Sequence, residues 1–349
     1  MIASYELTPF DYQLLILCVV MVSKIIMTTI SAHDPLRFFN FYCRLLSNKV
    51  LRSNAPTNQQ TLAGVISVLI TLSPLTLILW LFSAFIEVIF LWDAFLLYLA
   101  IGATALPKVS RKVASCLLQE KKQEAKTIIS PWLLRQTEPL SAMGIAKANI
   151  EVLALKSLQQ LYVPIFIFFV TGPLSALTYR LLLEMRYAWN IKRSVYANFG
   201  ALSYYLINII TWLPARLLAL IILLSSPPKR WLTYFRLSNE HFWQLNNNYL
   251  LQNFAYSLGV KLGGVALYDE KQTTTLLNQP STGDMKLAHH FTLSNNAESP
   301  SAYKLRKKQF NEKARQPDSH DILRATKKLQ IINVIFLVIL VLIGVFPAL

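Results

Sequence analysis

Long apolar runs set the strongest limit on how this chain folds. Membrane-spanning helices need about 20 consecutive apolar residues. With 54% hydrophobic and only 15% charged residues, the composition is that of an integral membrane protein. We therefore predict an all-α fold, a polytopic membrane helical bundle with about six transmembrane segments and amphipathic cytoplasmic helices. The apolar runs lie at residues 12–31, 62–87, 90–106, 162–183, 201–224 and 329–349.

The run at residues 201–224 carries Pro214 and Arg216 in an otherwise apolar helix. A charge at the bilayer centre costs about 2.5–3.5 kcal/mol on insertion scales, and it is tolerated when it faces a bundle interior, a cavity or the headgroups. The planar guanidinium of arginine suits carboxylates and phosphates. Arg216 is therefore a candidate ligand-binding residue between helices. The alternative is a structural charge that is paired with a buried acid or with helix-end carbonyls.

Basic residues gather in three polar connections, residues 32–61, 108–161 and 227–328, whose net charges are +3, +5 and +7. The positive-inside rule places them together, which predicts a multi-pass protein of the bacterial inner (plasma) membrane with cytoplasmic basic loops. The same rule accounts for the formal net charge of +16 without a nucleic-acid partner. The connector at 184–200 is an exception, because it is also basic, at net +2, and six crossings place it on the outer side. Either this connector re-enters the membrane or one neighbouring run does not span, and Gly172-Pro173 points to the run at 162–183.

Three regions follow from this pattern. Residues 1–268 form the membrane bundle with a cytoplasmic helical insertion at 108–161. Residues 269–321 are polar and poor in periodic apolar residues, which predicts a flexible cytoplasmic loop. Residues 322–349 supply the C-terminal transmembrane helix. The three cysteines lack metal or redox spacing, the sequence contains no Walker-type phosphate loop, and we predict no metal site.

Met143–Glu151, Gly172-Pro173, Leu177–Arg180 and Trp212–Leu217 follow one another in a consistent order along the chain. With further motifs, they resemble the CobD/CbiB family of cobalamin-biosynthesis membrane proteins. The resemblance implies an ATP-dependent, amide-forming (C–N) ligase of the adenosylcobinamide-phosphate synthase type, which attaches aminopropanol or its phosphate to adenosylcobyric acid. ATP and Mg²⁺ would be its cofactors if that activity is retained. The motifs are His33-Asp-Pro35, Met143–Glu151, Val163-Pro164, Gly172-Pro173, Leu177–Arg180, Trp212–Leu217, Ser257–Gly264 and Asp321–Ala325.

The chain departs from that family pattern mainly where the family carries acidic residues. Phosphates and hard cations such as Mg²⁺ are usually held through carboxylate oxygens. Losing carboxylates while the backbone-shaping residues remain predicts a retained fold with altered or lost catalysis. The alternative function is a non-catalytic regulatory or signalling membrane protein resembling AmpE, whose Pro-Val-Arg-Leu element and lysine pair correspond to Pro214–Leu217 and Lys327-Lys328. Acidic positions of the family align here with Gln136, Leu155, Gln159, Arg186 and Ile207-Asn208.

Glu151 survives from an acidic family motif and is the candidate catalytic residue, as a ligand or a base. Its alternative role is a solvated charge on a cytoplasmic helix. The other candidates, Arg180, Tyr179, Gly263 and Gly264, would bind the ligand together with Arg216. Their alternative roles are a headgroup anchor for the arginine, a core aromatic for the tyrosine and an ordinary turn for the glycines. The expected partners are the lipid bilayer and a corrinoid or phosphate-bearing ligand, with the oligomeric state left open.

Overall fold

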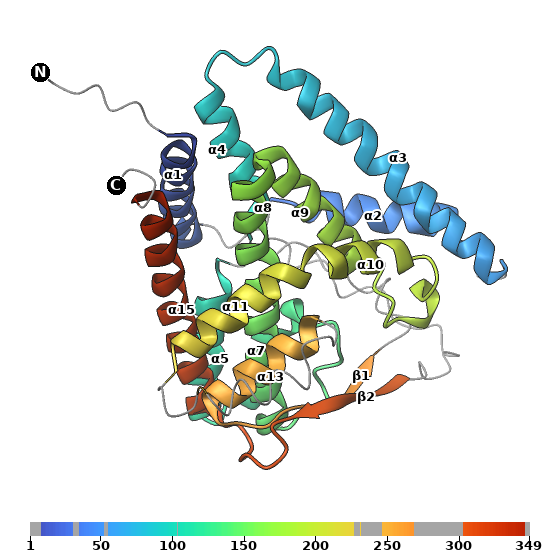
Figure 1. The fold of residues 1–349 in the computed structure, drawn as a ribbon. Coiled ribbons are helices and arrows are strands. Elements are labelled where there is room, and N and C mark those ends of the chain that lie inside the picture. Colours follow the sequence, from blue (N-terminus) through green and yellow to red (C-terminus); the bar gives the residue numbers. More distant parts are fainter. Residues whose placement is uncertain are drawn as a thin grey trace, which may run out of the picture.

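The computed structural model describes residues 8–30, 35–51, 55–102, 104–226, 231, 246–268 and 303–345. Helices dominate this part of the chain, and the prediction of an all-α membrane bundle is confirmed (Figure 1). Its α-helices are α1 (Pro9–Ile30), α2 (Arg37–Val50), α3 (Thr57–Ser83), α4 (Ile89–Ala100), α5 (Leu106–Leu118), α6 (Lys122–Ile129), α7 (Ala142–Ser157), α8 (Val163–Thr171), α9 (Pro173–Ala188), α10 (Ala201–Ile210), α11 (Trp212–Leu224), α13 (Asn246–Leu258) and α15 (Ser319–Val345).

Four helical segments among the described residues are long and apolar enough to cross a membrane. The helices α10 and α11 meet at a bend of 47° and make a fifth if they are one broken span. The predicted number was about six. The difference arises because α4 has only 12 residues and because the run at 201–224 is bent between α10 and α11. The four segments are Pro9–Thr28, Thr57–Ser83, Ala142–Thr171 and Ser319–Gly344.

The predicted run at 162–183 is broken at Gly172, whose φ of 94° lies in a region that side chains disfavour. Pro173 then opens α9, where a missing N–H costs nothing. On the other side, α8 continues from α7 through the π-helical turn η2 (Leu158–Tyr162). Residues 142–161, expected in a cytoplasmic insertion, therefore join an apolar helical segment of 30 residues.

The helix α9 lies at the centre of the bundle and contacts α2, α3, α4, α8 and α10. Its residues from Tyr179 to Arg186 are all buried. By contrast, α1, α3 and α15 expose large apolar side chains such as Ile25, Ile70 and Val334. An outward apolar surface on long helices is the pattern expected against lipid.

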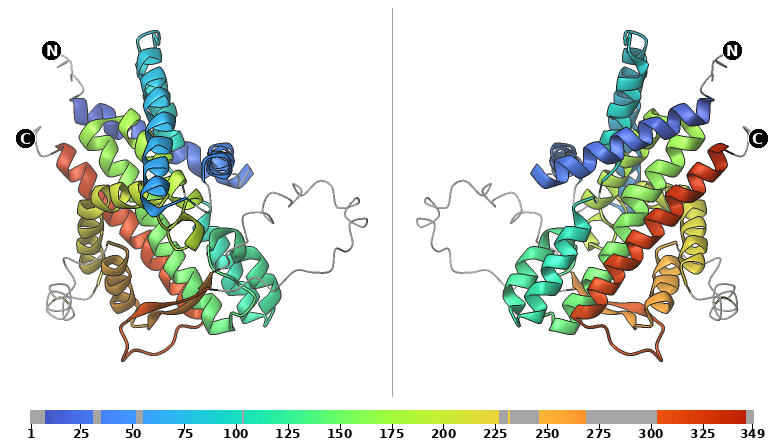
Figure 2. Two further views of the ribbon diagram at one scale, coloured as in Figure 1. Left: turned by 90° about the vertical axis from the view of Figure 1, so that its right-hand side faces the viewer. Right: turned by 90° about the vertical axis from the view of Figure 1, so that its left-hand side faces the viewer.

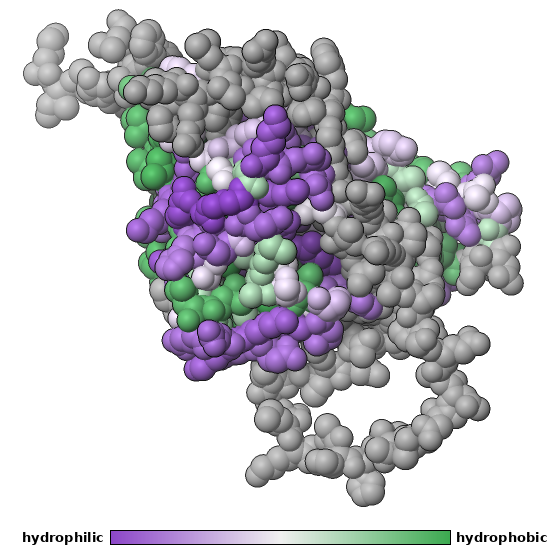
Figure 3. Space-filling view, turned by 90° about the horizontal axis from the view of Figure 1, so that it is seen from below, coloured by the Kyte–Doolittle hydropathy of each residue, from purple (hydrophilic) through white to green (hydrophobic). Residues whose placement is uncertain are grey.

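A small antiparallel sheet and polar helices close the lower end of the molecule in Figure 1. Strands β1 (Leu262–Tyr268) and β2 (Tyr303–Phe310) pair through backbone hydrogen bonds. The expectation of a flexible loop over 269–321 is therefore wrong for residues 303–310, since strand pairing satisfies their backbone groups. Residues 269–302, which include His289-His290, lie outside the described residues. Figure 3 views this end and displays many hydrophilic residues there.

Candidate functional site

A cavity of about 550 Å³ lies between α2, α7, α9, α10 and α13. The turn η2 and the segment Pro131–Arg135 also contribute to its wall. This volume falls within the range of small-molecule sites in proteins. Elements from most of the chain meet here, so the cavity exists only in the folded bundle.

Positive charge dominates the lining of this cavity. Among the described residues of its wall, the carboxylates are Glu151 and Glu184. Seven amide side chains supply further hydrogen-bonding groups: Asn40, Gln159, Gln160, Asn190, Asn208, Asn247 and Asn248. Guanidinium and amide donors together suit an anionic, oxygen-rich ligand. The six basic residues of the wall are Arg37, Arg44, Arg135, Lys156, Arg186 and Lys192.

Both carboxylates already have partners. Glu151 lies 3.8 Å from the Arg135 guanidinium and accepts a hydrogen bond of 2.9 Å from the Gly263 backbone N–H. Glu184 forms an ion pair of 2.7 Å with Arg180 and accepts a bond of 3.0 Å from the Asn40 amide. The negative charges are thus used within the protein, which leaves the other basic groups of the wall in excess.

Arg186 and Asn208 bring donors to the cavity that have no hydrogen-bond partner within the described part of the chain. They are the Arg186 Nη1 and the Asn208 Nδ2 groups. Arg186 is only 7% exposed, and its guanidinium lies 5.0 Å from the Tyr204 ring centre. Burial lowers the pKa of Arg186, while nearby tyrosines oppose that shift. A buried donor without an acceptor is costly, and an anionic ligand would remove this cost.

Of the predicted residues, Glu151 and Gly263 come together at the cavity wall, joined by their hydrogen bond. Arg180 is fully buried, lies outside the cavity lining and pairs with Glu184, which lines the cavity. The buried Tyr179 hydroxyl donates to the backbone carbonyl of Gln159 at 3.1 Å. Tyr179 therefore supports the π-helical turn, a kind of element that is frequent at functional sites.

Arg216 lies outside the cavity lining. Its Nη1 donates to the Trp212 carbonyl at 3.0 Å and to the Asn246 amide oxygen, and its guanidinium stacks 4.9 Å from the Tyr249 ring centre. Asn246 in turn donates to the Thr211 hydroxyl at 2.9 Å. These contacts tie the bend between α10 and α11 to α13. Arg216 is surrounded by protein, as expected, and its contacts are those of a structural charge.

Gly264 also lies outside the cavity lining. It adopts a φ of 109° at the irregular register between Gly263 and Val265. A side chain would be strained there. The role of Gly264 is thus to shape the strand that delivers the Gly263 N–H to Glu151.

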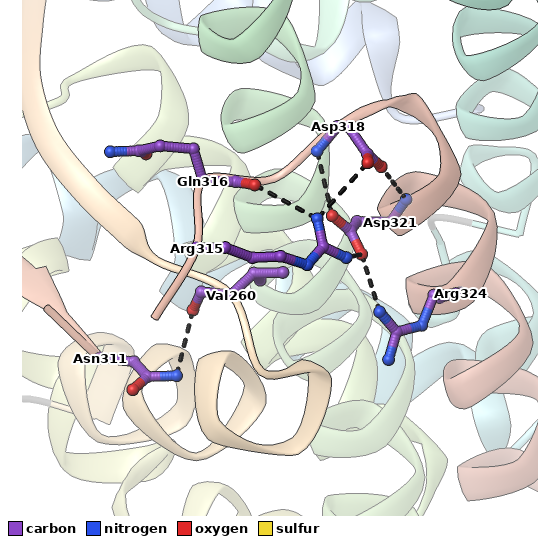
Figure 4. Close-up of polar contacts among 7 residues, drawn as sticks. All are labelled: Val260, Asn311, Arg315, Gln316, Asp318, Asp321 and Arg324. Atoms are coloured by element: carbon purple, nitrogen blue, oxygen red, sulfur yellow. Dashed lines mark hydrogen bonds and ion pairs between the residues drawn. The ribbon is translucent and has the colours of Figure 1, made fainter. Parts of the chain in front are cut away.

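Figure 4 displays the polar cluster that lies next to the start of strand β1. The fully buried Asp321 accepts hydrogen bonds from Arg315 at 2.6 Å, from Arg324 at 3.0 Å and from the Asp318 backbone N–H at 3.0 Å. The Arg315 carbonyl then accepts the Lys261 N–H at 2.9 Å. Asp321 therefore anchors the start of β1, two residues before Gly263.

Several cavity residues were not named as candidates from the sequence, including Arg37, Arg44, Lys156 and Arg186. Of these, Arg186 could have been found from the departures from the family pattern. Four of the six positions aligned above with acidic residues of the family line this cavity: Leu155, Gln159, Arg186 and Asn208.

The residues of this cavity do not fit a magnesium site. Among the described residues, no group of three His, Cys, Asp or Glu side chains could hold a metal ion. Mg²⁺ prefers carboxylate, phosphate and water oxygens, and the two cavity carboxylates are paired with arginines. The basic wall fits phosphates or carboxylates of a ligand instead.

Comparisons with known proteins agree with the motifs. A family model described as CobD/Cbib protein matches residues 17–292. The cobalamin biosynthesis protein CobD of Chromobacterium violaceum is 29% identical over 61% of this chain and 68% of its own length. Its counterpart in Stutzerimonas stutzeri is 28% identical over 59% and 68%. No solved structure matches the chain. With more than half of its length covered by the family model, the chain belongs to the CobD/CbiB family.

Proposed function

We propose that this protein acts in cobalamin biosynthesis by binding a carboxylate- or phosphate-bearing corrinoid intermediate in the basic cavity. The observation that carries the proposal is the buried Arg186, whose Nη1 has no acceptor among the described residues. Family membership and the names of the relatives support the pathway. The amide-rich wall complements the amide side chains of such a corrinoid.

Amide formation is the reaction that the family resemblance implies, and it needs an activated carboxylate. The cavity offers Glu151 and Glu184, but both are engaged by arginines. The residues do not fit the Mg²⁺ that would accompany ATP. We therefore propose ligand binding in an inner-membrane protein, with the cavity accessible from the cytoplasmic side, and we derive no ligase step.

The second candidate is a regulatory membrane protein of the AmpE type that responds to the bound ligand. The observation that favours it is the replacement of acidic family positions by Leu155, Gln159, Arg186 and Asn208 in one cavity. A receptor needs the cavity and its donors but no group that performs a bond-forming step.

Two measurements test these functions. The first is binding of cobyric acid to the protein in nanodiscs, where we expect saturable binding that the double variant Arg44→Gln/Arg186→Gln loses. The matched control is Lys122→Gln, an exposed charge on α6 outside the cavity. Absence of binding to the wild-type protein would refute the proposal.

The second measurement is growth of a strain that lacks its own synthase on cobyric acid. Binding without rescue of growth favours the regulatory candidate. Rescue would establish ligase activity and overturn our view that the cavity has lost the groups for catalysis.

A further inference from the structure

The helix α2 packs against the bundle through a mixed face and carries large apolar side chains on its outward face. On the packed side the Asn40 amide contacts Glu184, Cys43 and Ser47 are buried, and Phe39 and Leu46 are partly buried against the core. Its outward face carries large apolar side chains, and Phe38 is 86% exposed. An amphipathic helix in water turns its apolar stripe inward, so this outward stripe requires an apolar environment. The exposed stripe consists of Phe38, Phe41, Tyr42 and Leu45.

The position of α2 connects this stripe to the lipid-facing surface of the bundle. The helix follows α1 and precedes α3 along the chain, and both of these are candidate membrane spans. Figures 1 and 2 show α2 lying across the direction of α1 and α15. A short helix that crosses two candidate spans in this way is suited to lie along a membrane surface.

Basic residues flank the apolar stripe. Arg37 and Lys49 are exposed near the two ends of α2, and Arg44 is half-buried. Helices with this distribution bind at the boundary between headgroups and acyl chains, where cations attract anionic lipids. The aromatic side chains of the stripe are also suited to this boundary.

We infer that α2 docks on the bilayer surface, with Phe38, Phe41, Tyr42 and Leu45 inserted at the acyl boundary and its basic residues among anionic headgroups. The occupant of the exposed face is therefore a phospholipid bilayer. This inference does not depend on which ligand the cavity takes.

A consequence for the cavity follows from the same helix. Arg37, Asn40 and Arg44 lie along the edge between the apolar stripe and the packed face, and all three line the cavity. With α2 on the membrane surface, this wall of the cavity lies at headgroup level. A ligand with an anionic group can then approach along the membrane surface past Arg37 and Arg44.

Spin labelling of the full-length protein tests the docking. Phe38→Cys and Leu45→Cys are each made in a Cys18→Ser background, because Cys43 and Cys116 are buried. The labelled protein is reconstituted into vesicles of phosphatidylcholine and phosphatidylglycerol. We expect both labels to be more accessible to oxygen than to a water-soluble nickel complex, because oxygen concentrates in the acyl region.

Two reference positions calibrate this experiment. Leu69→Cys on the candidate span α3 reports a lipid-facing site, and Gln123→Cys on the exposed part of α6 reports an aqueous one. Tyr42→Cys replaces Phe38→Cys if that variant does not fold. Nickel accessibility at α2 equal to that of Gln123 would overturn the inference. Dipolar broadening between labels would also overturn it, since it identifies a second copy of the chain as the occupant.

Discussion

Arg216 and Arg186 are both buried arginines on helices of the bundle, and their surroundings differ in one decisive respect. Arg216 donates to a backbone carbonyl and to the Asn246 side chain and lies between aromatic rings. Arg186 faces a cavity with an Nη1 donor that has no hydrogen-bond partner among the described residues. Arg216 is held by protein contacts outside the cavity, whereas Arg186 lines the cavity and has a donor there for a ligand.

The two arginines show that burying a charge in the bundle and using that charge to bind a ligand are separate matters. An arginine in an apolar helix needs partners wherever it lies, so its presence in an apolar run does not identify a binding site. The informative property is whether an unsatisfied donor lines a cavity that a ligand can occupy. This criterion favours the cavity beside α9 over the Pro214–Leu217 motif as the candidate site.

Replacement of Glu151 by alanine should have the largest effect. The change leaves the Arg135 guanidinium buried without its carboxylate and removes the acceptor of the Gly263 N–H. Breaking a buried pair from one side costs about 3–5 kcal/mol, so we expect a marked fall in thermal stability in detergent. Glu151→Gln can keep the hydrogen bond to Gly263 but also removes the charge that faces Arg135, so it should lose most of the same stability. A Glu151→Gln variant as stable as the wild type would contradict the ion pair.

Arg216→Met should come next, with an effect on stability alone. It preserves volume but leaves the Trp212 carbonyl and the Asn246 amide without this donor. Unsatisfied buried groups cost about 1–3 kcal/mol each, which predicts a lower melting temperature and lower yield. The folded fraction should bind cobyric acid with unchanged affinity. A weakened affinity at normal stability would place Arg216 in the ligand site and remove the contrast with Arg186.

The general architecture could be predicted because apolar runs and family motifs are local signals. The spans at α1, α3 and α15 and the polar lower end follow from hydropathy alone. Gly172-Pro173 marked a break in the run at 162–183. The continuation of α7 into α8 could not be predicted, because the π-helical turn at Leu158–Tyr162 depends on packing such as the Tyr179 bond to Gln159.

The candidate site was harder to predict because it is assembled from distant segments. Glu151 and Gly263 were identified separately through the family motifs, but their hydrogen bond spans more than a hundred residues of chain. Arg37 and Arg44 read as ordinary charges of a basic loop until α2 packs on α9. The replaced acidic positions carried the information about the cavity, since only folding reveals that they converge.

Arg186→Gln should have the smallest of the three effects and one confined to binding. Glutamine retains hydrogen-bonding groups but removes the positive charge that faces the cavity. A hydrogen bond to a charged group contributes about 1.5 kcal/mol or more, so we expect roughly tenfold weaker cobyric acid binding and little change in melting temperature. The Nη1 has no acceptor to lose among the described residues, which is why stability should hold. Calorimetric titration of Arg186→Gln beside Lys122→Gln measures this difference. A large fall in stability with unchanged affinity would make Arg186 a second structural arginine like Arg216.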